Sequence, residues 1–295
     1  MRKAVIDLGT NTFNLLVADV VNDQLEVIHS ERIPVLLGMG GINQGILAED
    51  AFSRGIAALR SFRATCDELK VERIIGFGTS ALRAASNSEE FTSKVELELG
   101  FEIRIITGLQ EAQLIYEGVK WLYDFSEPAV IMDIGGGSTE FISADHDGLK
   151  EAISLDIGVS RIYQLLKKPV EYTDKDRTTI RSAFAEESKS LLKLKGPKIL
   201  IGASGSFETF YEMIFEKEYQ PKPSLDDLPV DKLREVIDWS ISASHTEREN
   251  NQWIIPIRKS MLPIGALKVK WVMELLGLEK VYLSPYSLKE GGFNY

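Results

Sequence analysis

The sequence contains little cysteine and no long apolar run. A single cysteine, Cys66, cannot form an intrachain disulfide, and its place in a helical pattern predicts a buried thiol. No hydrophobic stretch approaches the roughly 20 residues that a bilayer-spanning helix requires. The N-terminal segment passes directly into a strand pattern without a signal-peptide core. We therefore expect a cytoplasmic protein with no membrane partner.

Basic residues and histidines are also scarce. The chain has 34 Lys and Arg against 44 Asp and Glu, a net charge of −10, so a general DNA-binding surface is not expected. A polyanionic substrate remains compatible with this charge if a local basic channel receives it. The three histidines, His29, His146 and His245, are too few and too scattered to predict a multi-histidine metal cluster.

The remaining composition is that of an ordinary globular protein. At 295 residues the chain is long enough for two domains, and strand-like and helical runs alternate along it, which favours an α/β fold. We expect a first domain at residues 1–124, joined by the C-terminal segment 286–295, and a second domain at 125–285 with helical insertions. The strand-like runs are 4–6, 13–20, 25–30, 73–77, 102–106, 129–132, 140–144, 151–155, 198–201 and 281–283.

An internal repeat is the most informative pattern. Residues 6–12 (IDLGTNT) are echoed by residues 132–138 (MDIGGGS), 126 positions later. In each copy an aspartate ends an apolar strand, a tight polar turn follows, and a second strand ends near a turn dipeptide, Asn22-Asp23 or Asp147-Gly148. The repeat predicts a duplicated β-hairpin unit in two similar domains that face each other across a cleft.

The two turns have the chemistry of a phosphate clamp. Glycine and small hydroxyl residues let backbone N–H groups approach phosphate oxygens closely. Asp7 and Asp133, at the strand ends, can hold Mg²⁺ or another divalent cation. A single turn of this kind is often no more than a hairpin closure, whereas two matching copies favour the clamp. No G-x-x-x-x-G-K-[ST] sequence occurs, so a P-loop is not expected.

Five segments, in this order along nearly the whole chain, carry a resemblance to a known family. They are residues 4–15 (AVIDLGTNTFNL), 78–87 (GTSALRAASN), 106–119 (ITGLQEAQLIYEGV), 131–141 (IMDIGGGSTEF) and 200–205 (LIGASG). The sequence resembles the exopolyphosphatase and guanosine pentaphosphate phosphohydrolase (Ppx/GppA) family, a branch of the actin-like ATPase superfamily. This resemblance implies two actin-like (ribonuclease H-like) domains with a cleft between them.

The resemblance also implies roles for individual residues. Glu111 matches a general base that activates water, although the dipole of the helix that it begins should favour its ionised form and limit its basicity. Asp133 and Glu140 match catalytic acids, with Asp7 as a further metal ligand, and Arg83 matches a phosphate-binding arginine. The remaining expected phosphate-binding residues are Gly9, Thr10, Asn11, Thr12, Gly135, Gly136, Gly137, Ser138 and Thr139.

A third glycine-containing turn resembles the nucleotide site of the superfamily. Ser204, Gly205 and Ser206 precede a helix whose N-terminus could face an anion. A plain strand-to-helix connection explains this turn equally well. Arg258 is a candidate for the same nucleotide or polyanion site, and Arg161 and Lys268 are candidates for lining a polyanion channel, although each alone is more often a solvated charge.

Three positions depart from the family pattern, namely Gln110, Ser260 and Ser287. The implied activity is an exopolyphosphatase that removes terminal phosphate from inorganic polyphosphate with a divalent cation, and the close alternative is a guanosine pentaphosphate phosphohydrolase. More distant alternatives are a sugar or acetate kinase and a non-catalytic actin-like sensor or filament subunit. Residues 78–87 and 106–119 argue against the kinase. A homodimer is the common default for a soluble enzyme.

Overall fold

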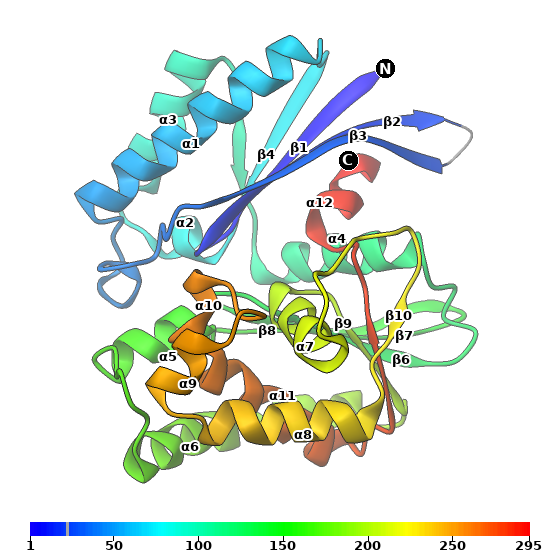
Figure 1. Ribbon diagram of the computed structural model, residues 1–295. Coiled ribbons are helices and arrows are strands. Elements are labelled where there is room, and N and C mark those ends of the chain that lie inside the picture. The colour runs from blue at the N-terminus through cyan, green and yellow to red at the C-terminus, as the bar shows by residue number, and fades with distance from the viewer. Residues whose placement is uncertain (22–23) are drawn as a thin grey trace.

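The computed structural model describes residues 1–21 and 24–295, so the predicted turn at Asn22-Asp23 lies outside the described residues. Two β-sheets with helices packed around them make up this part of the chain (Figure 1). This arrangement confirms the predicted α/β architecture. None of the helices within the described residues combines the length and the apolar character needed to cross a bilayer.

The first sheet has five strands in the order β3-β2-β1-β4-β5. β1 lies at its centre, antiparallel to β2 and parallel to β4. Ala4, Val5 and Ile6 of β1 are fully buried because both faces of this strand are covered. The strands are β1 Arg2–Leu8, β2 Thr12–Val21, β3 Gln24–Pro34, β4 Arg73–Gly78 and β5 Ile103–Ile105.

Helices α1 (Glu49–Glu68) and α3 (Ser88–Leu99) cover one face of this sheet (Figure 1). Ile56, Leu59 and Phe62 recur at helical spacing on α1 and pack into the core below it. Cys66 lies in the same core and is buried, as predicted. The two shorter helices here are η1 Ile42–Gln44 and α2 Ser80–Ala84.

The start of α3 has no side-chain cap. Asn87 stands at the N-cap, but its side chain makes no capping hydrogen bond. The Asn87 amide instead pairs with both backbone polar groups of Leu47, at 2.8 and 3.0 Å. The Asn87 side chain therefore holds the loop before α1, which contains Leu47, against the start of α3.

The second sheet has six strands in the order β10-β11-β9-β6-β7-β8. Its strands β8-β7-β6-β9-β11 repeat the order and the parallel or antiparallel pairings of β3-β2-β1-β4-β5. The strands are β6 Ala129–Ile134, β7 Thr139–Asp145, β8 Gly148–Leu155, β9 Ile199–Gly202, β10 Asp226–Asp227 and β11 Lys280–Leu283. Each described strand except the short β10 overlaps one of the strand-like runs expected from the sequence.

The repeat extends to an irregularity in strand pairing. Register shifts occur between Val17 and Ala18 in the first sheet and between Ser143 and Ala144 in the second. These positions are 126 residues apart, the same separation as the two aspartates. The structure therefore confirms that the hairpin unit is duplicated. We call β1–β2 the first hairpin and β6–β7 the second hairpin, and their sheets with the surrounding helices the first and second units.

Helices of the second unit surround its sheet, and the apolar α11 packs against α6 and α8 (Figure 1). Residues 220–222, which include Pro221, lie in a loop without regular structure. The helices are α5 Val159–Leu165, α6 Asp174–Leu191, η2 Leu192–Leu194, α7 Gly205–Phe215, α8 Val230–Ser242, α9 His245–Asn250, α10 Pro256–Lys259 and α11 Leu262–Leu276.

Helix α4 (Gly108–Lys120) lies between the two sheets, beside the C-terminal α12 (Leu288–Gly291) and η3 (Gly292–Asn294) (Figure 1). Its Ile115 shares a core with Val5 of the first sheet and Ile131 of the second. A Cβ atom at Gly291 would collide with the α4 backbone, so the two helices pack at close range. The C-terminal segment thus contacts α4 and the first sheet, and the domain division at residue 124 stays a prediction.

Candidate active site

A cavity lies between the two units where the turns of the two hairpins meet. Asp7 and Asp133, at the ends of β1 and β6, both line it. The predicted residues that line this cavity are Asp7, Gly9, Thr10, Asn11, Thr12, Glu111, Asp133, Gly135, Gly136, Gly137, Ser138, Ser204, Gly205, Ser206 and Arg258. Residues separated by up to 251 positions in the sequence therefore reach one site.

The two turns touch because glycine stands on one side of the contact. A Cβ atom at Gly136 would lie 2.9 Å from atoms of both Thr10 and Asn11. A Cβ atom at Gly137 would lie 2.5 Å from the Ser80 hydroxyl. These distances leave no room for a larger residue. The glycines of the second turn are thus required for the approach of the two hairpins.

Each aspartate has a partner directly across its hairpin. Asp7 stands opposite Asn14, and Asp133 stands opposite Glu140. The Asn14 amide donates a hydrogen bond of 3.0 Å to the Asp7 carboxylate. The Glu140 carboxylate accepts a 2.7 Å hydrogen bond from Ser154 of β8. The equivalent positions of the repeat therefore hold an amide in one hairpin and an acid in the other.

The buried positions of Asp7 and Asp133 suit a divalent cation. Burial raises the pKa of Asp7 to about 6 and the pKa of Asp133 to about 7, and the charge of Asp7 adds to the shift of Asp133. Carboxylates that repel one another in a desolvated cavity are stabilised by a hard cation with oxygen ligands. Asp7 and Asp133, with Glu140 behind Asp133, are the residues that would hold it.

One contact to Asp133 has no signal in the sequence. Ser287, at the start of α12, donates a 2.6 Å hydrogen bond from its hydroxyl to the Asp133 carboxylate. This residue departs from the family pattern, and the contact gives it a place in the site. Ser80 also lines the cavity, and its buried hydroxyl has no hydrogen-bond partner among the described residues. Ser80 is therefore a further candidate donor to a ligand.

Glu111 projects from the first turns of α4 toward the cavity. The helix begins with a capping box in which Thr107 and Gln110 exchange hydrogen bonds of 2.9 and 3.2 Å. Gln110 thus serves as an exposed cap, which explains how this departure from the family pattern is accommodated. Glu111 itself is 7% exposed, and its carboxylate accepts a 2.9 Å hydrogen bond from Arg83.

The electrostatics of Glu111 differ from the sequence-based expectation. Burial raises the pKa of Glu111 to about 7, although the neighbouring Arg83 opposes this shift, and the charges of Asp7 and Asp133 add to it. Desolvation therefore outweighs the helix dipole, which was expected to keep the group weakly basic. A carboxylate with a pKa near neutrality is well matched to accept a proton.

Three predicted site residues do not line the cavity. Arg83 is turned to Glu111 and to the carbonyl oxygen of Ile106, at 2.9 and 2.8 Å. Thr139 is fully buried and accepts a 2.7 Å hydrogen bond from Lys268. Glu140 is 1% exposed, and burial raises its pKa well above the ordinary value. These residues lie behind the cavity wall, where they support the groups that form it.

The predicted polyanion channel is only partly present. Lys268 is fully buried, and burial lowers its pKa to about 7, so it cannot line a channel. Arg161 donates to the carbonyl oxygen of Gly137 and pairs with Asp156, so it braces the second turn from outside. Arg258 does line the cavity. Arg32 lines it as well, although no sequence pattern singled out this residue.

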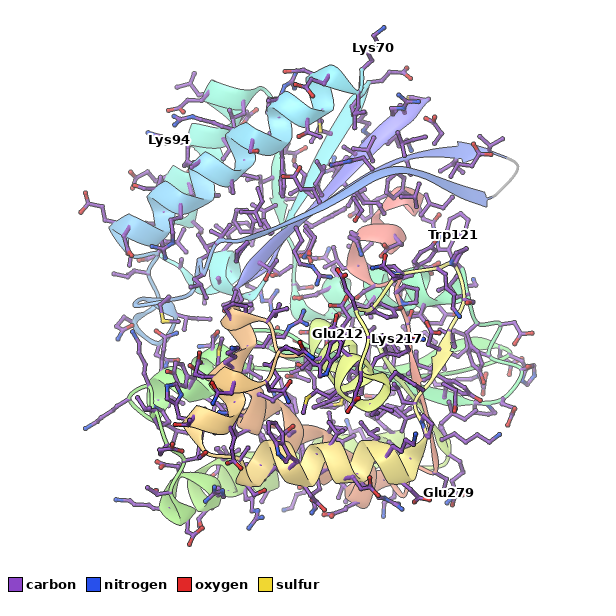
Figure 2. All side chains as sticks on the ribbon, in the orientation of Figure 1. Lys70, Lys94, Trp121, Glu212, Lys217 and Glu279 are labelled. Carbon is purple, nitrogen blue, oxygen red and sulfur yellow. The ribbon has the colours of Figure 1, made fainter. Side chains whose placement is uncertain are left out.

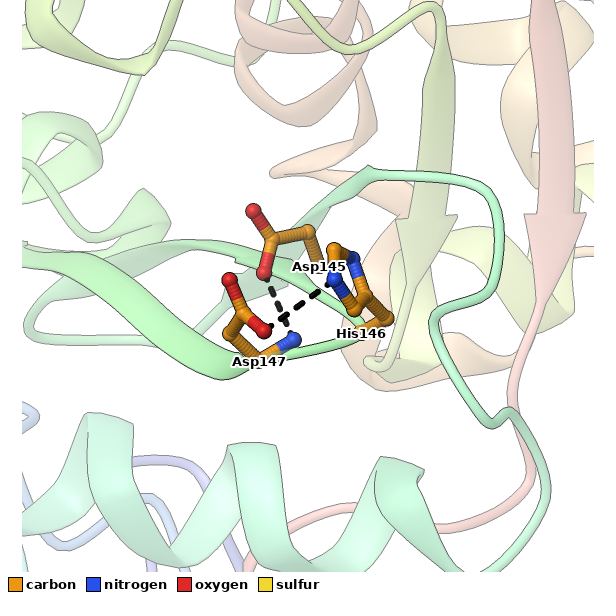
Figure 3. A group of neighbouring side chains, drawn as sticks. All are labelled: Asp145, His146 and Asp147. Carbon is orange, nitrogen blue, oxygen red and sulfur yellow. Dashed lines mark hydrogen bonds and ion pairs between the residues drawn. The ribbon is translucent and has the colours of Figure 1, made fainter.

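A separate acidic group lies on the surface, away from the cavity. Within the described residues, only Asp145, His146 and Asp147 form a group of three metal-type side chains whose donor atoms all lie within 4.8 Å of one another (Figure 3). They occupy the turn between β7 and β8, where His146 and Asp147 are exposed. The predicted ligands Asp7, Asp133 and Glu140 are more widely spaced, which suits Mg²⁺ held by one or two carboxylates, waters and substrate oxygens.

Residues 16–294 match the Ppx/GppA phosphatase family. The chain belongs to this family. A crystal structure of an exopolyphosphatase from Cytophaga hutchinsonii superposes with a TM-score of 0.91, at 31% sequence identity over 100% of this chain and 97% of that chain. The Ppx/GppA family member of Aquifex aeolicus superposes with a TM-score of 0.82, at 26% identity over 99% and 96% of the two chains. The predicted actin-like fold is confirmed.

A curated relative extends beyond the aligned region. The guanosine-5'-triphosphate,3'-diphosphate pyrophosphatase of Aeromonas hydrophila subsp. hydrophila is 30% identical over 291 residues, which include 98% of this chain. The chain spans 58% of the length of that relative. The alignment with this relative therefore covers the two units described above.

Proposed function

We propose that this Ppx/GppA family member hydrolyses the terminal phosphoanhydride bond of inorganic polyphosphate. The observation that carries the proposal is Glu111, a buried carboxylate on the cavity wall beside two phosphate-type hairpin turns. A hydrolase uses such a base to activate water and a phosphotransferase uses one to activate its acceptor, so the requirement for an acceptor separates the two. Glu111 has the position and the pKa for that base.

The hairpin turns supply the groups that hold the terminal phosphate. Backbone N–H groups of the glycine-rich turns, with the hydroxyls of Thr12 and Ser138, are placed around the cavity to donate to phosphate oxygens. A divalent cation near Asp7 and Asp133 would offset phosphate charge. Because Asp133 is also hydrogen-bonded to Ser287, its orientation toward the cavity is fixed in advance.

Glu111 then accepts a proton from the attacking water. Arg83 contacts the same carboxylate at 2.9 Å and the helix-start carbonyl of Ile106 at 2.8 Å, so it fixes the orientation of the base rather than contacting the cavity. The direct phosphate contact expected of Arg83 from the sequence stays a prediction. The leaving group would be the shortened polyphosphate chain, and the products would be this chain and orthophosphate.

The close alternative is removal of the terminal phosphate from guanosine pentaphosphate. The name of the Aeromonas hydrophila relative supports it, and so does the turn at Ser204, Gly205 and Ser206, which lines the cavity at the N-terminus of α7. The exopolyphosphatase from Cytophaga hutchinsonii, which superposes over the whole chain, favours polyphosphate. Both substrates would present the same terminal phosphate to Glu111.

The variant Glu111→Gln tests the proposal. It keeps the size of the side chain and its contact to Arg83 but removes the base, so phosphate release from long polyphosphate with Mg²⁺ should fall by roughly 10²- to 10⁴-fold. In the native protein the rate should rise as pH rises through about 7, because the deprotonated form of Glu111 is the active one. That rise should be absent from the residual activity of the variant.

The matched control is Glu117→Gln on the same helix. Glu117 is bonded to Gln113 at 3.0 Å and does not line the cavity, so its replacement should leave the rate within about twofold of native. Native-like phosphate release by the Glu111 variant would refute the base assignment. Phosphate transfer that occurs only when an acceptor alcohol or acid is added would instead identify a kinase.

A further inference from the structure

A bridge of three charged side chains spans the cavity between the two units. Glu208 projects from the first turn of α7 in the second unit and accepts two hydrogen bonds from Arg32 of β3, at 2.8 and 2.9 Å. Its carboxylate also accepts a 3.0 Å hydrogen bond from Arg258 of α10. We call Arg32, Glu208 and Arg258 the cleft bridge. All three residues line the same cavity as the hairpin turns.

The bridge connects parts of the chain that share no secondary structure. Arg32 and Glu208 are 176 residues apart, and their paired hydrogen bonds form the fork-to-carboxylate geometry in which arginine binds anions most strongly. The side chains of Glu208 and Arg258 are 16% and 19% exposed, so water screens this contact only partly, whereas the side chain of Arg32 is 45% exposed. The contact between Glu208 and Arg258 is therefore less screened than an ion pair on the open surface.

The two arginines keep the Glu208 carboxyl group ionised. Burial alone would raise the pKa of Glu208, but Arg32 and Arg258 more than offset it and hold the pKa well below its ordinary value. Glu208 is thus an anion throughout the physiological range. The bridge carries two guanidinium groups and one carboxylate, which leaves a net positive charge beside the cavity.

Both arginines are held in place by further contacts. Arg32 donates from Nε to Asn14 at 3.1 Å, and Asn14 donates in turn to Asp7. Arg258 donates to the Thr209 hydroxyl at 2.9 Å and packs over Gly205, where any Cβ atom would collide with its guanidinium. The guanidinium groups would therefore stay near their present positions if Glu208 moved away.

We propose that Glu208 is an internal competitor for the substrate, occupying the two guanidinium groups that the inner phosphates of a polyanion would otherwise bind. This inference rests on the proposed polyanionic substrate. A guanidinium fork binds one carboxylate or one phosphate at a time, so a ligand must displace Glu208 to use Arg32 and Arg258. A ligand with several phosphates can displace it, whereas orthophosphate reaches the hairpin turns without contacting the bridge. Glu208 thereby lowers the affinity for multiply phosphorylated ligands while leaving that for orthophosphate unchanged.

The test is binding of tripolyphosphate and of orthophosphate by calorimetry, in buffer free of divalent cations so that no turnover occurs. Glu208→Gln removes the competing charge, and tripolyphosphate should bind roughly tenfold more tightly, within the usual range of such coupling between sites. Orthophosphate affinity should change by less than about twofold. Arg32→Gln should weaken tripolyphosphate binding.

Two variants serve as matched controls for charge. Glu212 lies one helical turn farther along α7, bonds to the backbone N–H of Tyr219 at 3.1 Å and does not line the cavity. Glu279 lies at the outer edge of the second unit, paired with Lys198 (Figure 2). Glu212→Gln and Glu279→Gln remove the same charge as the test variant. Both should bind tripolyphosphate as the native protein does.

The outcomes separate this inference from the proposed function. If native protein binds tripolyphosphate and Glu208→Gln binds it no more tightly than the two controls, Glu208 is not a competitor, while hydrolysis by Glu111 is unaffected. If neither protein binds it, the measurement is repeated with Mg²⁺ in the Glu111→Gln background, where turnover is slow, and absence of binding there too would mean that the polyanionic substrate is wrong. Should Glu208→Gln fail to fold, Glu208→Asp keeps the charge but cannot span both arginines. It should then bind tripolyphosphate about threefold more tightly, and unchanged or weaker binding would overturn the inference.

Discussion

The two hairpins occupy equivalent places in the duplicated fold, yet they hold different side chains against the cavity. The first pairs Asp7 with Asn14, and the second pairs Asp133 with Glu140. Asn14 connects Asp7 to Arg32 and so to the cleft bridge. The carboxylate of Glu140 accepts a hydrogen bond from Ser154. Glu140 and the nearby Glu111 repel each other, and this repulsion adds to the raised pKa of Glu140.

The difference continues behind the turns. Phe13 of the first hairpin is buried in an apolar core, while the equivalent Thr139 is bonded to the buried Lys268. Gly136 of the second turn stands at the position that Thr10 holds in the first, and the two meet in the contact between the turns. Duplication has therefore preserved the backbone while the side chains diverged. In the proposed function, the first hairpin connects to the cleft bridge through Asn14, and the second faces Glu111.

The largest predicted effect concerns the aspartate that each hairpin carries at the end of its first strand. Asp7→Asn and Asp133→Asn should each reduce Mg²⁺-dependent phosphate release by roughly 10³-fold, the rate equivalent of several kcal/mol of charge stabilisation, and excess EDTA should have the same effect on the native protein. Initial rates over a Mg²⁺ titration measure this. Near-native activity for one of the two variants would show that the hairpins differ in cation binding as well.

The surface turn supplies a control for cation binding. Asp145→Asn, combined with Asp147→Asn, alters the exposed group shown in Figure 3 without touching the cavity. The Mg²⁺ dependence of this double variant should match that of the native protein. A shift of its half-saturation by more than about tenfold would instead place the functional cation at the surface turn.

A smaller effect is predicted where the two turns touch. Gly136→Ala places a Cβ atom 2.9 Å from Thr10 and Asn11, so overpacking should lower the free energy of unfolding by about 1–3 kcal/mol and reduce phosphate release. Urea unfolding measures the change in stability. Gly265→Ala is the control, because the nearest atom to its new Cβ is 3.4 Å away, and helix propensity should leave stability unchanged or higher. Equal losses in both variants would argue against a close contact between the turns.

The smallest effect concerns the support behind the second hairpin. Lys268→Met leaves the Thr139 hydroxyl and the Ile157 carbonyl without their donor and should cost about 1 kcal/mol of unfolding free energy. Adding Thr139→Val removes the unpaired hydroxyl and should recover about half of that loss, while the Ile157 carbonyl stays without its donor. Urea unfolding of the single and double variants measures both changes. No recovery in the double variant would mean that Lys268 acts through another contact.

Sequence patterns predicted those parts of the site that repeat or follow a local rule. The hairpins were visible because their aspartates and glycines recur 126 residues apart, and Glu111 was visible from its surrounding segment. Arg32, Glu208 and Ser287 were not, because their contacts join distant segments and depend on how the two units meet. The same limit explains Lys268, whose charge suggested a channel although tertiary packing buries it.

Phosphate release from long polyphosphate, tripolyphosphate and guanosine pentaphosphate, measured side by side with Mg²⁺, tests the central claim most directly. The proposed function predicts that orthophosphate is released without any acceptor, and that polyphosphate is cleaved faster than guanosine pentaphosphate. Faster release from guanosine pentaphosphate would favour the alternative substrate at the same site. If none of the three is cleaved, the assignment of this cavity as a phosphoanhydride hydrolase is wrong.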